Sequence, residues 1–234
     1  MKTRIFCATL IISWIHTGLA QTGQFTVSGL SDPWLSGMPN GSTASAGDTA
    51  PYESPVLVTG IPVAGGSAYS FSASGFVAYD VGLPFYGPDG WAANFVPHTT
   101  GAENGIASLT SPLDAVVGIF LGPNQPSLNP APNALNFSTA SSQDYLTLSP
   151  SLQQPFFIGD GLTSSQVIQQ VIAPAGATRL YIGTFDASGW YNDPGAFTVY
   201  VTRVPEPSIA AISLIGFGVL CLVKKASRKH RPMV

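Results

Sequence analysis

The sequence predicts an all-β protein, an antiparallel β-sandwich of the jelly-roll type. Apolar residues alternate with polar ones in several short runs, which is the period of a half-buried strand. Turn-forming residues separate these runs, since the chain has 25 Gly and 20 Pro. Between residues 21 and 203 only the stretch 164–173 has helical spacing, and its apolar residues suit a strand about as well. We therefore expect about eight or nine strands in two packed sheets.

Some segments carry clearer strand patterns than others. The alternating ones, which we expect to be half-buried, are 24–29, 67–74, 178–185 and 195–202. The continuously apolar ones, which we expect to be buried on both faces, are 55–60, 114–122 and 155–159. Two long stretches, 31–55 and 122–145, are polar and broken by proline, so they predict loops. Loops of that length are usually functional or mobile.

Residues 1–20 have the layout of a signal peptide. Lys2 and Arg4 precede an apolar centre, and Gly18 and Ala20 stand at the spacing of a signal-peptidase site. We expect cleavage after Ala20. The alternative is an uncleaved anchor, which the short apolar stretch and its interruption by His16 disfavour.

The C-terminal residues 204–234 have three parts. Pro205, Glu206 and Pro207 come first, an uncharged apolar run follows at 208–223, and a basic tail ends the chain at 224–234. Because proline interrupts a regular helix, we expect a helix to begin after the Pro-Glu-Pro. The apolar run is 16 residues long, whereas a stable membrane span needs about 20. Basic residues beside such a helix stay in the cytoplasm, so the body of the protein is expected outside it.

This order of Pro-Glu-Pro, apolar run and basic end resembles a PEP-CTERM sorting signal. The resemblance implies an exosortase-type enzyme that recognises the chain at Pro205, Glu206 and Pro207, cuts there and removes the tail. It also implies a Gram-negative bacterium that makes exopolysaccharide. The protein would be held transiently in the inner membrane and then delivered to the cell envelope or extracellular matrix. A plain C-terminal anchor is the alternative.

Charge is concentrated unevenly along the chain. Of nine Lys and Arg, only Arg179 and Arg203 lie between the two end segments, whereas eleven of the twelve acids lie there. The exported part is therefore acidic, with no basic surface for nucleic acid or anionic lipid. Cys7 and Cys221 both fall in the end segments. A chain without disulfides makes a metal ion worth seeking as a staple for its loops.

No catalytic motif is present in residues 21–203. The patterns G-x-S-x-G, H-E-x-x-H and C-x-x-C are absent, and His98 is the one histidine in this part. Paired carboxylates of a glycosidase type are compatible with the composition, but no particular pair is indicated. We expect a non-enzymatic protein, with a carbohydrate-active enzyme as the weakest alternative.

The segment 180–201 contains the most informative pattern. An expected strand ends at Asp186, Gly189 and Trp190 follow, and Asn192 and Asp193 lead into the last strand. Calcium takes six to eight oxygen ligands from carboxylates, amides and main-chain carbonyls, and one such loop can present several. Asp, Asn and Gly are also the residues of an ordinary hairpin turn. From the residues alone, both interpretations stand.

A series of short motifs also resembles, in order, the galactophilic PA-IL-like lectins. The motifs are GFVAY, YGPDG, VVGIFLG, PFFIGDG and FDASGWYNDPGAFTVYV, within residues 55–202. These lectins are small calcium-dependent β-sandwiches whose bound sugar ligates the metal, so the resemblance implies a galactose-binding-like sandwich. The ligands that the resemblance implies are the side chains of Asp186, Asn192 and Asp193 and the main-chain carbonyls of Tyr79 and of Gly189 or Trp190.

The chain departs from the lectin pattern around the sugar. The loop from Asp186 to Asn192 is one residue shorter, and Pro194 replaces a small polar residue. His98 and Asn104 are the nearest counterparts of the family's sugar-contacting His and Gln. Trp190 offers an aromatic face to a sugar ring, although burial in the core is the favoured interpretation of this residue.

The sequence thus predicts an exported, non-enzymatic cell-surface or matrix protein with a lectin-like calcium site. Carbohydrate or exopolysaccharide is the expected partner. The alternative is a structural or adhesive biofilm-matrix protein whose sandwich binds no sugar.

Overall fold

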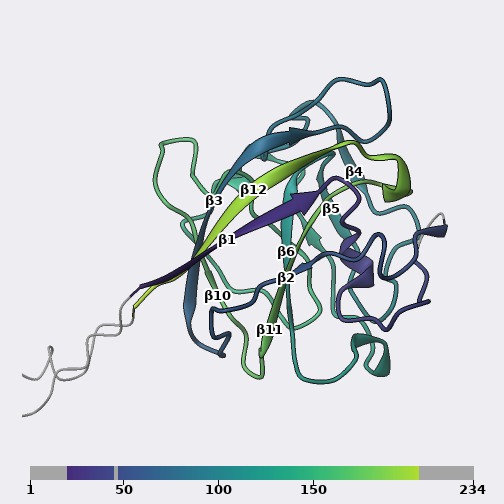
Figure 1. Ribbon diagram of the computed structural model, residues 1–234. Helices are drawn as coiled ribbons and strands as arrows, with labels where there is room; N and C mark the ends of the chain where they lie inside the picture. Colours follow the sequence, from purple (N-terminus) through teal and green to yellow (C-terminus); the bar gives the residue numbers. More distant parts are fainter. Residues whose placement is uncertain (1–19, 45–46, 206–234) are drawn as a thin grey trace, which may run out of the picture. The chain divides into compact units, whose positions relative to one another are not determined.

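A computed structural model describes residues 20–44 and 47–205 (Figure 1). The contacts within the chain define a unit from Ala20 to Val204. The expected signal peptide, the Glu206–Pro207 pair, the helix at 208–223 and the basic tail lie outside the described residues. Within the described part, no helix is long and apolar enough to cross a membrane.

The described unit is all-β. Twelve strands are present in it, and its one α-helix, α1, is the four-residue segment Ala140–Gln143. The stretch 164–173, which had helical spacing, forms no helix and instead ends in a strand, β10 (Gln170–Ile172). The strand count exceeds the expected eight or nine because several strands have only two or three residues, too few to produce an alternating pattern.

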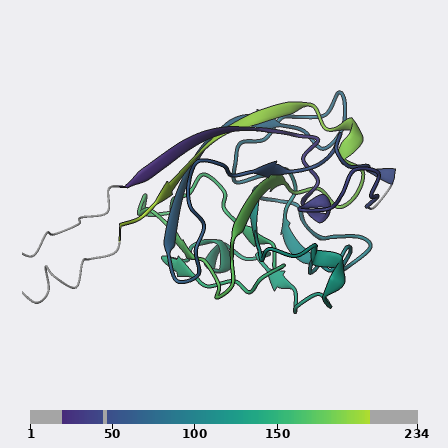
Figure 2. The ribbon, with the colours of Figure 1, turned by 60° about the horizontal axis from the view of Figure 1, so that its bottom comes forward.

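Five strands form the first sheet, in the order β1-β12-β3-β10-β8. Their bounds are Gln21–Ser28 for β1, Gly195–Arg203 for β12, Ala68–Val77 for β3, Gln170–Ile172 for β10 and Thr147–Leu148 for β8. The three long strands are antiparallel neighbours, with β12 in the middle. In Figure 2, β1 and β12 run side by side along the upper side of the unit.

Two smaller sheets complete the unit. One has the order β2-β11-β6-β9, with bounds Val56–Leu57, Arg179–Thr184, Val116–Leu121 and Phe156–Phe157. The other has the order β4-β5-β7, with bounds Phe95–Pro97, Leu109–Pro112 and Leu135–Asn136. Every segment with an expected strand pattern contains one of these strands.

The main core lies between the first and second sheets. Tyr69 of β3 packs against Phe120 of β6 with ring centroids 5.7 Å apart, and Phe71 packs against Phe156 at 6.3 Å. All six residues of β6 are buried, as its continuous apolar run predicts. These apolar side chains belong to the unit from Ala20 to Val204 and contact one another. We therefore expect this unit to fold without the two end segments.

The expected burial of residues 55–60 on both faces is wrong. The strand there, β2, has only two residues, and Leu57 is 39% exposed. The reason is its position, because β2 is an edge strand of its sheet and pairs only with β11.

The long segment 31–55 is a loop as expected, but its first residues are buried. A 3-10 turn, η1 (Pro33–Leu35), begins where the Asp32 carboxylate accepts a hydrogen bond from Trp34 N at 2.8 Å. The Trp34 side chain is fully buried and donates from Nε1 to the carbonyl of Ala107 at 3.1 Å. A segment that reads as polar thus supplies one of the largest core side chains.

Candidate functional site

The loop between β11 and β12 is held from within by an aromatic side chain. Trp190 begins a 3-10 turn, η4 (Trp190–Asn192), and its fully buried indole donates from Nε1 to Thr184 O at 3.0 Å. Gly189, just before this turn, has φ of 86°, a left-handed conformation that glycine adopts without strain. The predicted core role of Trp190 is therefore confirmed.

A second anchor comes from a distant part of the chain. Asp48 is fully buried, and its two carboxylate oxygens accept hydrogen bonds from Trp190 N at 3.1 Å and Tyr191 N at 3.0 Å. Burial raises the pKa of Asp48, while these two hydrogen bonds act to lower it. Asp48 was not predictable as part of this loop, because nothing in its Gly- and Ser-rich surroundings relates it to a loop more than a hundred residues away.

Three carboxyl groups beside this loop form what we call the acidic cluster: Asp114, Asp186 and Asp193. Their exposed fractions are 2%, 5% and 3%. Asp114 precedes β6 and has φ of 68°, and its main-chain N–H donates to Phe185 O at 2.7 Å, which brings it beside Asp186. Buried carboxylates normally have hydrogen-bond partners. Here Asp114 Oδ2 and Asp193 Oδ1 have none.

The pKa values of the acidic cluster reflect this environment. Burial, followed by the charge of Asp186, raises the pKa of Asp114 to about 8. Burial is also the main reason that the pKa of Asp186 rises to about 7 and that of Asp193 to about 9. The neighbouring charges of Asp48 and Asp80 raise both of the latter further. Negative charge is therefore disfavoured at three adjacent positions.

No basic side chain of the described residues neutralises the cluster. The described part contains two arginines and no lysine. Arg179 donates to the carbonyls of Gly122 and Asn124, and Arg203 donates to Ser67 Oγ. The residues present thus leave the acidic cluster without a protein counter-ion.

The remaining expected calcium ligands lie at the same end of the unit. The amide of Asn192 donates to Asp80 Oδ1 at 2.9 Å. The hydrogen bond from Ala78 N to Pro194 O, 3.1 Å long, brings the chain at Tyr79 next to the turn that follows Asp193. The ligands that the resemblance implies therefore come from two segments that the fold places side by side.

The residues expected to contact sugar are placed differently. His98 is 2% exposed, and its ring is stacked on Trp34 with centroids 3.4 Å apart. Its Nδ1 lies 2.6 Å from Gly101 O, and burial lowers its pKa. Asn104 donates its amide protons to Trp34 O and Thr43 O. With His98 and Trp190 buried, neither ring has an open face, so a sugar-contacting role does not fit these side chains.

A different group of aromatic rings is half-exposed next to the acidic cluster. Trp91 is stacked between Tyr79, at 6.1 Å, and Tyr86, at 5.3 Å between ring centroids. The hydrogen bond from Trp91 N to Leu113 O, 2.7 Å long, places these rings next to Asp114 of the cluster. Burial, with Tyr79 and Asp114 nearby, raises the pKa of Tyr86. We call these three rings the aromatic stack. The sequence alone shows a tryptophan in this loop, but it does not predict that the three rings meet. The β-bridge between Val77 and Tyr86 brings them together.

A second acidic region lies elsewhere and is built differently. Asp89, Asp144 and Asp160, which we call the turn acids, line a pocket of about 540 Å³. Each of them accepts a main-chain N–H: Asp89 from Asp160, Asp160 from Leu162, and Asp144 from Ser164. Aspartates with this pattern stabilise turns. Asp89 is exposed and accepts its hydrogen bond from Asp160 N at 2.9 Å.

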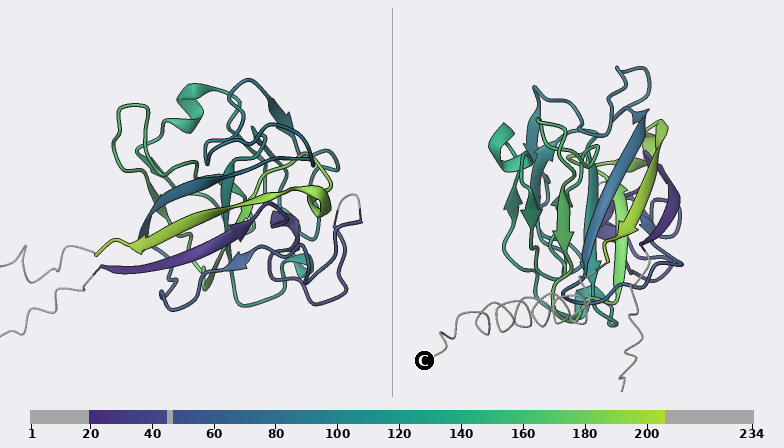
Figure 3. Two further views of the ribbon diagram at one scale, coloured as in Figure 1. Left: turned by 45° about the horizontal axis from the view of Figure 1, so that its top comes forward. Right: turned by 90° about the vertical axis from the view of Figure 1, so that its left-hand side faces the viewer.

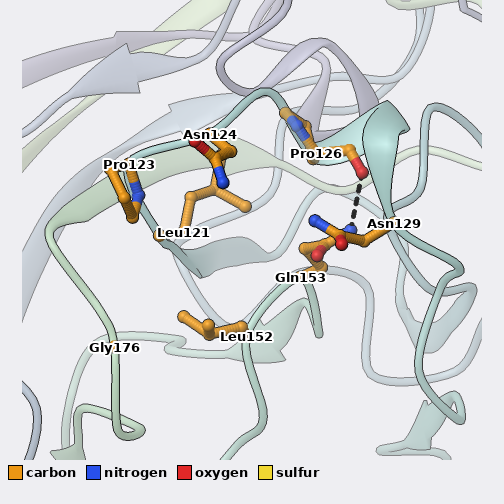
Figure 4. Close-up of a pocket in the computed structure, with 9 residues that line it drawn as sticks. Leu121, Pro123, Asn124, Pro126, Asn129, Leu152, Gln153 and Gly176 are labelled. Carbon is orange, nitrogen blue, oxygen red and sulfur yellow. Dashed lines mark hydrogen bonds between the residues drawn. The ribbon is translucent and has the colours of Figure 1, made fainter.

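A third concave region is small and has no charged lining residue. Its volume is about 210 Å³, and its walls include Leu121, Pro123, Leu152 and Gln153 (Figure 4). Gln153 Nε2 is already engaged with the carbonyls of Gly105 and Pro126. This pocket offers little specific chemistry.

Metal ligation by carboxylates alone is not seen in residues 20–44 and 47–205. No three His, Cys, Asp or Glu side chains of that part are grouped so as to hold a metal ion. The expected calcium ligands would not form such a group, since three of the five are an amide and two main-chain carbonyls. No family model and no curated protein matches the chain.

Proposed function

We propose that the unit is a calcium-dependent carbohydrate-binding module, exported to the cell surface or matrix and built as a jelly-roll sandwich. The observation that carries this proposal is the pair of buried, unpartnered carboxylate oxygens of Asp114 and Asp193 beside Asp186. Buried charge without a partner costs several kcal/mol per ion. Such groups must either keep their protons or share a cation.

Calcium suits the available donors best. Carboxylates, an amide and main-chain carbonyls are all hard oxygen ligands, which calcium prefers and zinc does not. The side chains of Asp186, Asn192 and Asp193 and the carbonyls of Tyr79 and Gly189 would hold the ion. Asp114, which the sequence did not indicate, lies next to Asp186 through the bond from its main-chain N–H to Phe185 O, and it adds an acidic group near the ion without belonging to the ligand set.

Carbohydrate is the ligand class that the surroundings favour. A bound calcium ion with open coordination positions accepts vicinal sugar hydroxyls as oxygen ligands. The aromatic stack of Tyr79, Trp91 and Tyr86 supplies a partly exposed ring surface beside the cluster, and aromatic faces suit the apolar face of a pyranose. This stack takes the place of His98, Asn104 and Trp190 in the proposal.

A structural or adhesive matrix protein is the second candidate. It is favoured by the burial of His98 and Trp190, since a site that had lost sugar binding would retain calcium only to hold loops together. In either case the function is non-enzymatic. The targeting segments support export and processing by an exosortase-type enzyme, with removal of the tail near Pro205.

Calorimetric titration of calcium into residues 20–205 tests the metal. We expect one ion per chain, binding lost in Asp193→Asn, and binding retained in the matched control Asp144→Asn. A glycan array probed with and without chelator then separates the candidates. Calcium-dependent glycan binding supports the lectin-like module, whereas calcium binding without any glycan signal favours the structural protein. No calcium binding at millimolar concentration overturns both versions of the site.

Mass spectrometry tests the sorting proposal. The exported protein should begin at Gln21 and lack the residues after the Pro-Glu-Pro. An intact basic tail on the surface-associated protein would reduce this segment to a plain anchor.

A further inference from the structure

The strands at the edges of the three sheets differ in length. The terminal strands of the described sheets are β1, β8, β2, β9, β4 and β7. Five of these have only two or three residues, and very short edge strands are a common protection against pairing with another chain. The exception is β1, with eight residues. Figure 3 shows it as the outer strand of its sheet, with β12 and then β3 beside it.

The free edge of β1 presents an ordered row of main-chain groups. The register of β1 with β12 is uninterrupted from Gln21↔Arg203 to Ser28↔Ala196, and the hydrogen bond from Gly29 N to Gly195 O extends it. In an antiparallel pair, alternate residues bond to the partner strand. The odd-numbered residues of β1 therefore bond to β12. The N–H and C=O groups of Thr22, Gln24 and Thr26 point away from it, and all three residues are exposed.

The usual chemical protections are also missing from β1. Its sequence, QTGQFTVS, has no charged residue and no proline, and the register has no bulge. The side chains on the outer face are small or polar, with Thr22 Oγ1 hydrogen-bonded to Thr202 Oγ1 of β12 at 2.8 Å. Natural edges are usually blocked by charge, proline or a bulge, so this one is built to accept a strand.

We propose that the free edge of β1 pairs with β1 of a second copy of this chain, forming a two-fold symmetric dimer. Antiparallel pairing centred on Gln24 places Thr22 opposite Thr26 of the second copy and Gln24 opposite its own counterpart. All the free N–H and C=O groups of these three residues are then used, and the two five-stranded sheets become continuous. A two-fold axis requires such a self-complementary edge.

The partner is a second copy because the edge complements itself. No charge lies on either side of the pairing to oppose it, and like charges opposite one another would be destabilising. Two paired strands bury less than the roughly 800 Å² per partner of a stable complex. The dimer is therefore reversible, and two binding sites per dimer would raise the avidity for a repeating polymer.

Cysteine cross-linking tests the register. Opposed residues in a hydrogen-bonded pair have Cα atoms about 5.5 Å apart, within reach of a disulfide. Residues 20–205 contain no cysteine, so Gln24→Cys should give a disulfide dimer under mild oxidation. Thr26→Cys is the matched control, because its counterpart is displaced by four residues, about 13 Å along the strands. The pair Thr22→Cys with Thr26→Cys should restore cross-linking.

Light scattering on residues 20–205 tests the dimer without a cross-link. We expect a concentration-dependent dimer that Gln24→Lys weakens at least tenfold by placing two charges opposite one another. Ser72→Lys on β3 adds the same charge to the same face away from the edge and should leave the dimer intact. A monomer at millimolar concentration, or equal cross-linking of Gln24→Cys and Thr26→Cys, would overturn the proposal. Circular dichroism confirms that each variant is folded.

Discussion

The acidic cluster and the turn acids contain the same residue type in opposite situations. Asp114, Asp186 and Asp193 are at most 5% exposed, and two of their oxygens lack any partner. The turn acids Asp89, Asp144 and Asp160 each accept a main-chain N–H at the rim of an open pocket.

The difference shows what burial does to a carboxylate. A turn acid accepts a main-chain N–H and so contributes one local hydrogen bond. A buried acid without a counter-ion loses the solvation of its charged form, so its pKa rises. The pKa values of about 7 to 9 in the acidic cluster therefore reflect burial first and the neighbouring acids second. In the proposal, a bound cation would offset both effects.

The pH dependence of stability should separate the two regions most strongly. In the cluster the folded pKa values lie well above the ordinary value of an aspartate, so the folded state holds protons that the unfolded chain has released. Without calcium, the stability from these groups is fully present below about pH 4 and is lost as pH rises through 7 to 9. For each proton that the folded state holds in excess of the unfolded state, the free energy of unfolding falls by about 1.4 kcal/mol for every unit by which the pH rises.

Thermal unfolding in chelator at pH 5 and pH 8 measures this loss. Asp114→Asn combined with Asp193→Asn should flatten the profile, and Asp144→Asn should leave it as steep as in the wild type. A wild-type stability that rises from pH 5 to pH 8 would contradict the proposed environment.

The effect of neutralising a single cluster residue on the free energy of unfolding should depend on calcium. In chelator at pH 8, Asp193→Asn removes a buried acid with an unpartnered oxygen and should raise the free energy of unfolding by about 1–3 kcal/mol. In excess calcium the same substitution removes a ligand. The variant then loses the wild-type stabilisation, which is about 2.7 kcal/mol at a hundredfold excess over Kd. Chemical denaturation under both conditions is the measurement, and an equal change in the free energy of unfolding in chelator and in calcium would rule out a metal at this carboxylate.

Removing Asp48, which anchors the loop, should lower the free energy of unfolding by a smaller amount. Asp48→Ala leaves Trp190 N and Tyr191 N without their acceptors, at a cost of about 1–2 kcal/mol. Because the loop carries Asp186 and Asp193, calcium affinity should fall as well. Asp48→Asn, which retains one acceptor, should lie between the wild type and Asp48→Ala in both measurements.

The smallest effect is expected at a turn acid. Asp144→Ala removes the bonds from Ser164 N and Ser164 Oγ at an exposed position, at a cost of about 0.5–1 kcal/mol. Calcium should not alter this difference. A loss of calcium binding in Asp144→Ala would move the metal site to the turn acids.

Several parts of the fold were predictable because their patterns are local. The alternation in 67–74 and 195–202 corresponds to β3 and β12, and the continuous apolar run in 114–122 corresponds to the buried strand β6. Each strand shows one face to the core and one to solvent, or is covered on both sides. The burial of a strand can therefore be predicted from the pattern of its own residues.

The candidate site was predictable only in part. Asp186, Asn192 and Asp193 lie in one loop and were recognised together, whereas Asp48 and Asp114 are far from it in sequence. Asp48 reaches the loop through hydrogen bonds to Trp190 and Tyr191, and Asp114 through its bond to Phe185. No local pattern encodes such distant contacts.

The sequence by itself determined the fold class, most of the strands and the loop richest in Asp and Asn side chains, because these depend on the order of neighbouring residues. Only the tertiary structure decided that Trp34 and His98 stack in the core, that Asp114 joins Asp186 and Asp193, and that β1 is left at an edge. These outcomes depend on which segments pack together. Burial is a property of that packing rather than of any single segment. The energy of a buried charge or of an unpaired strand depends on burial and is therefore also decided by the packing.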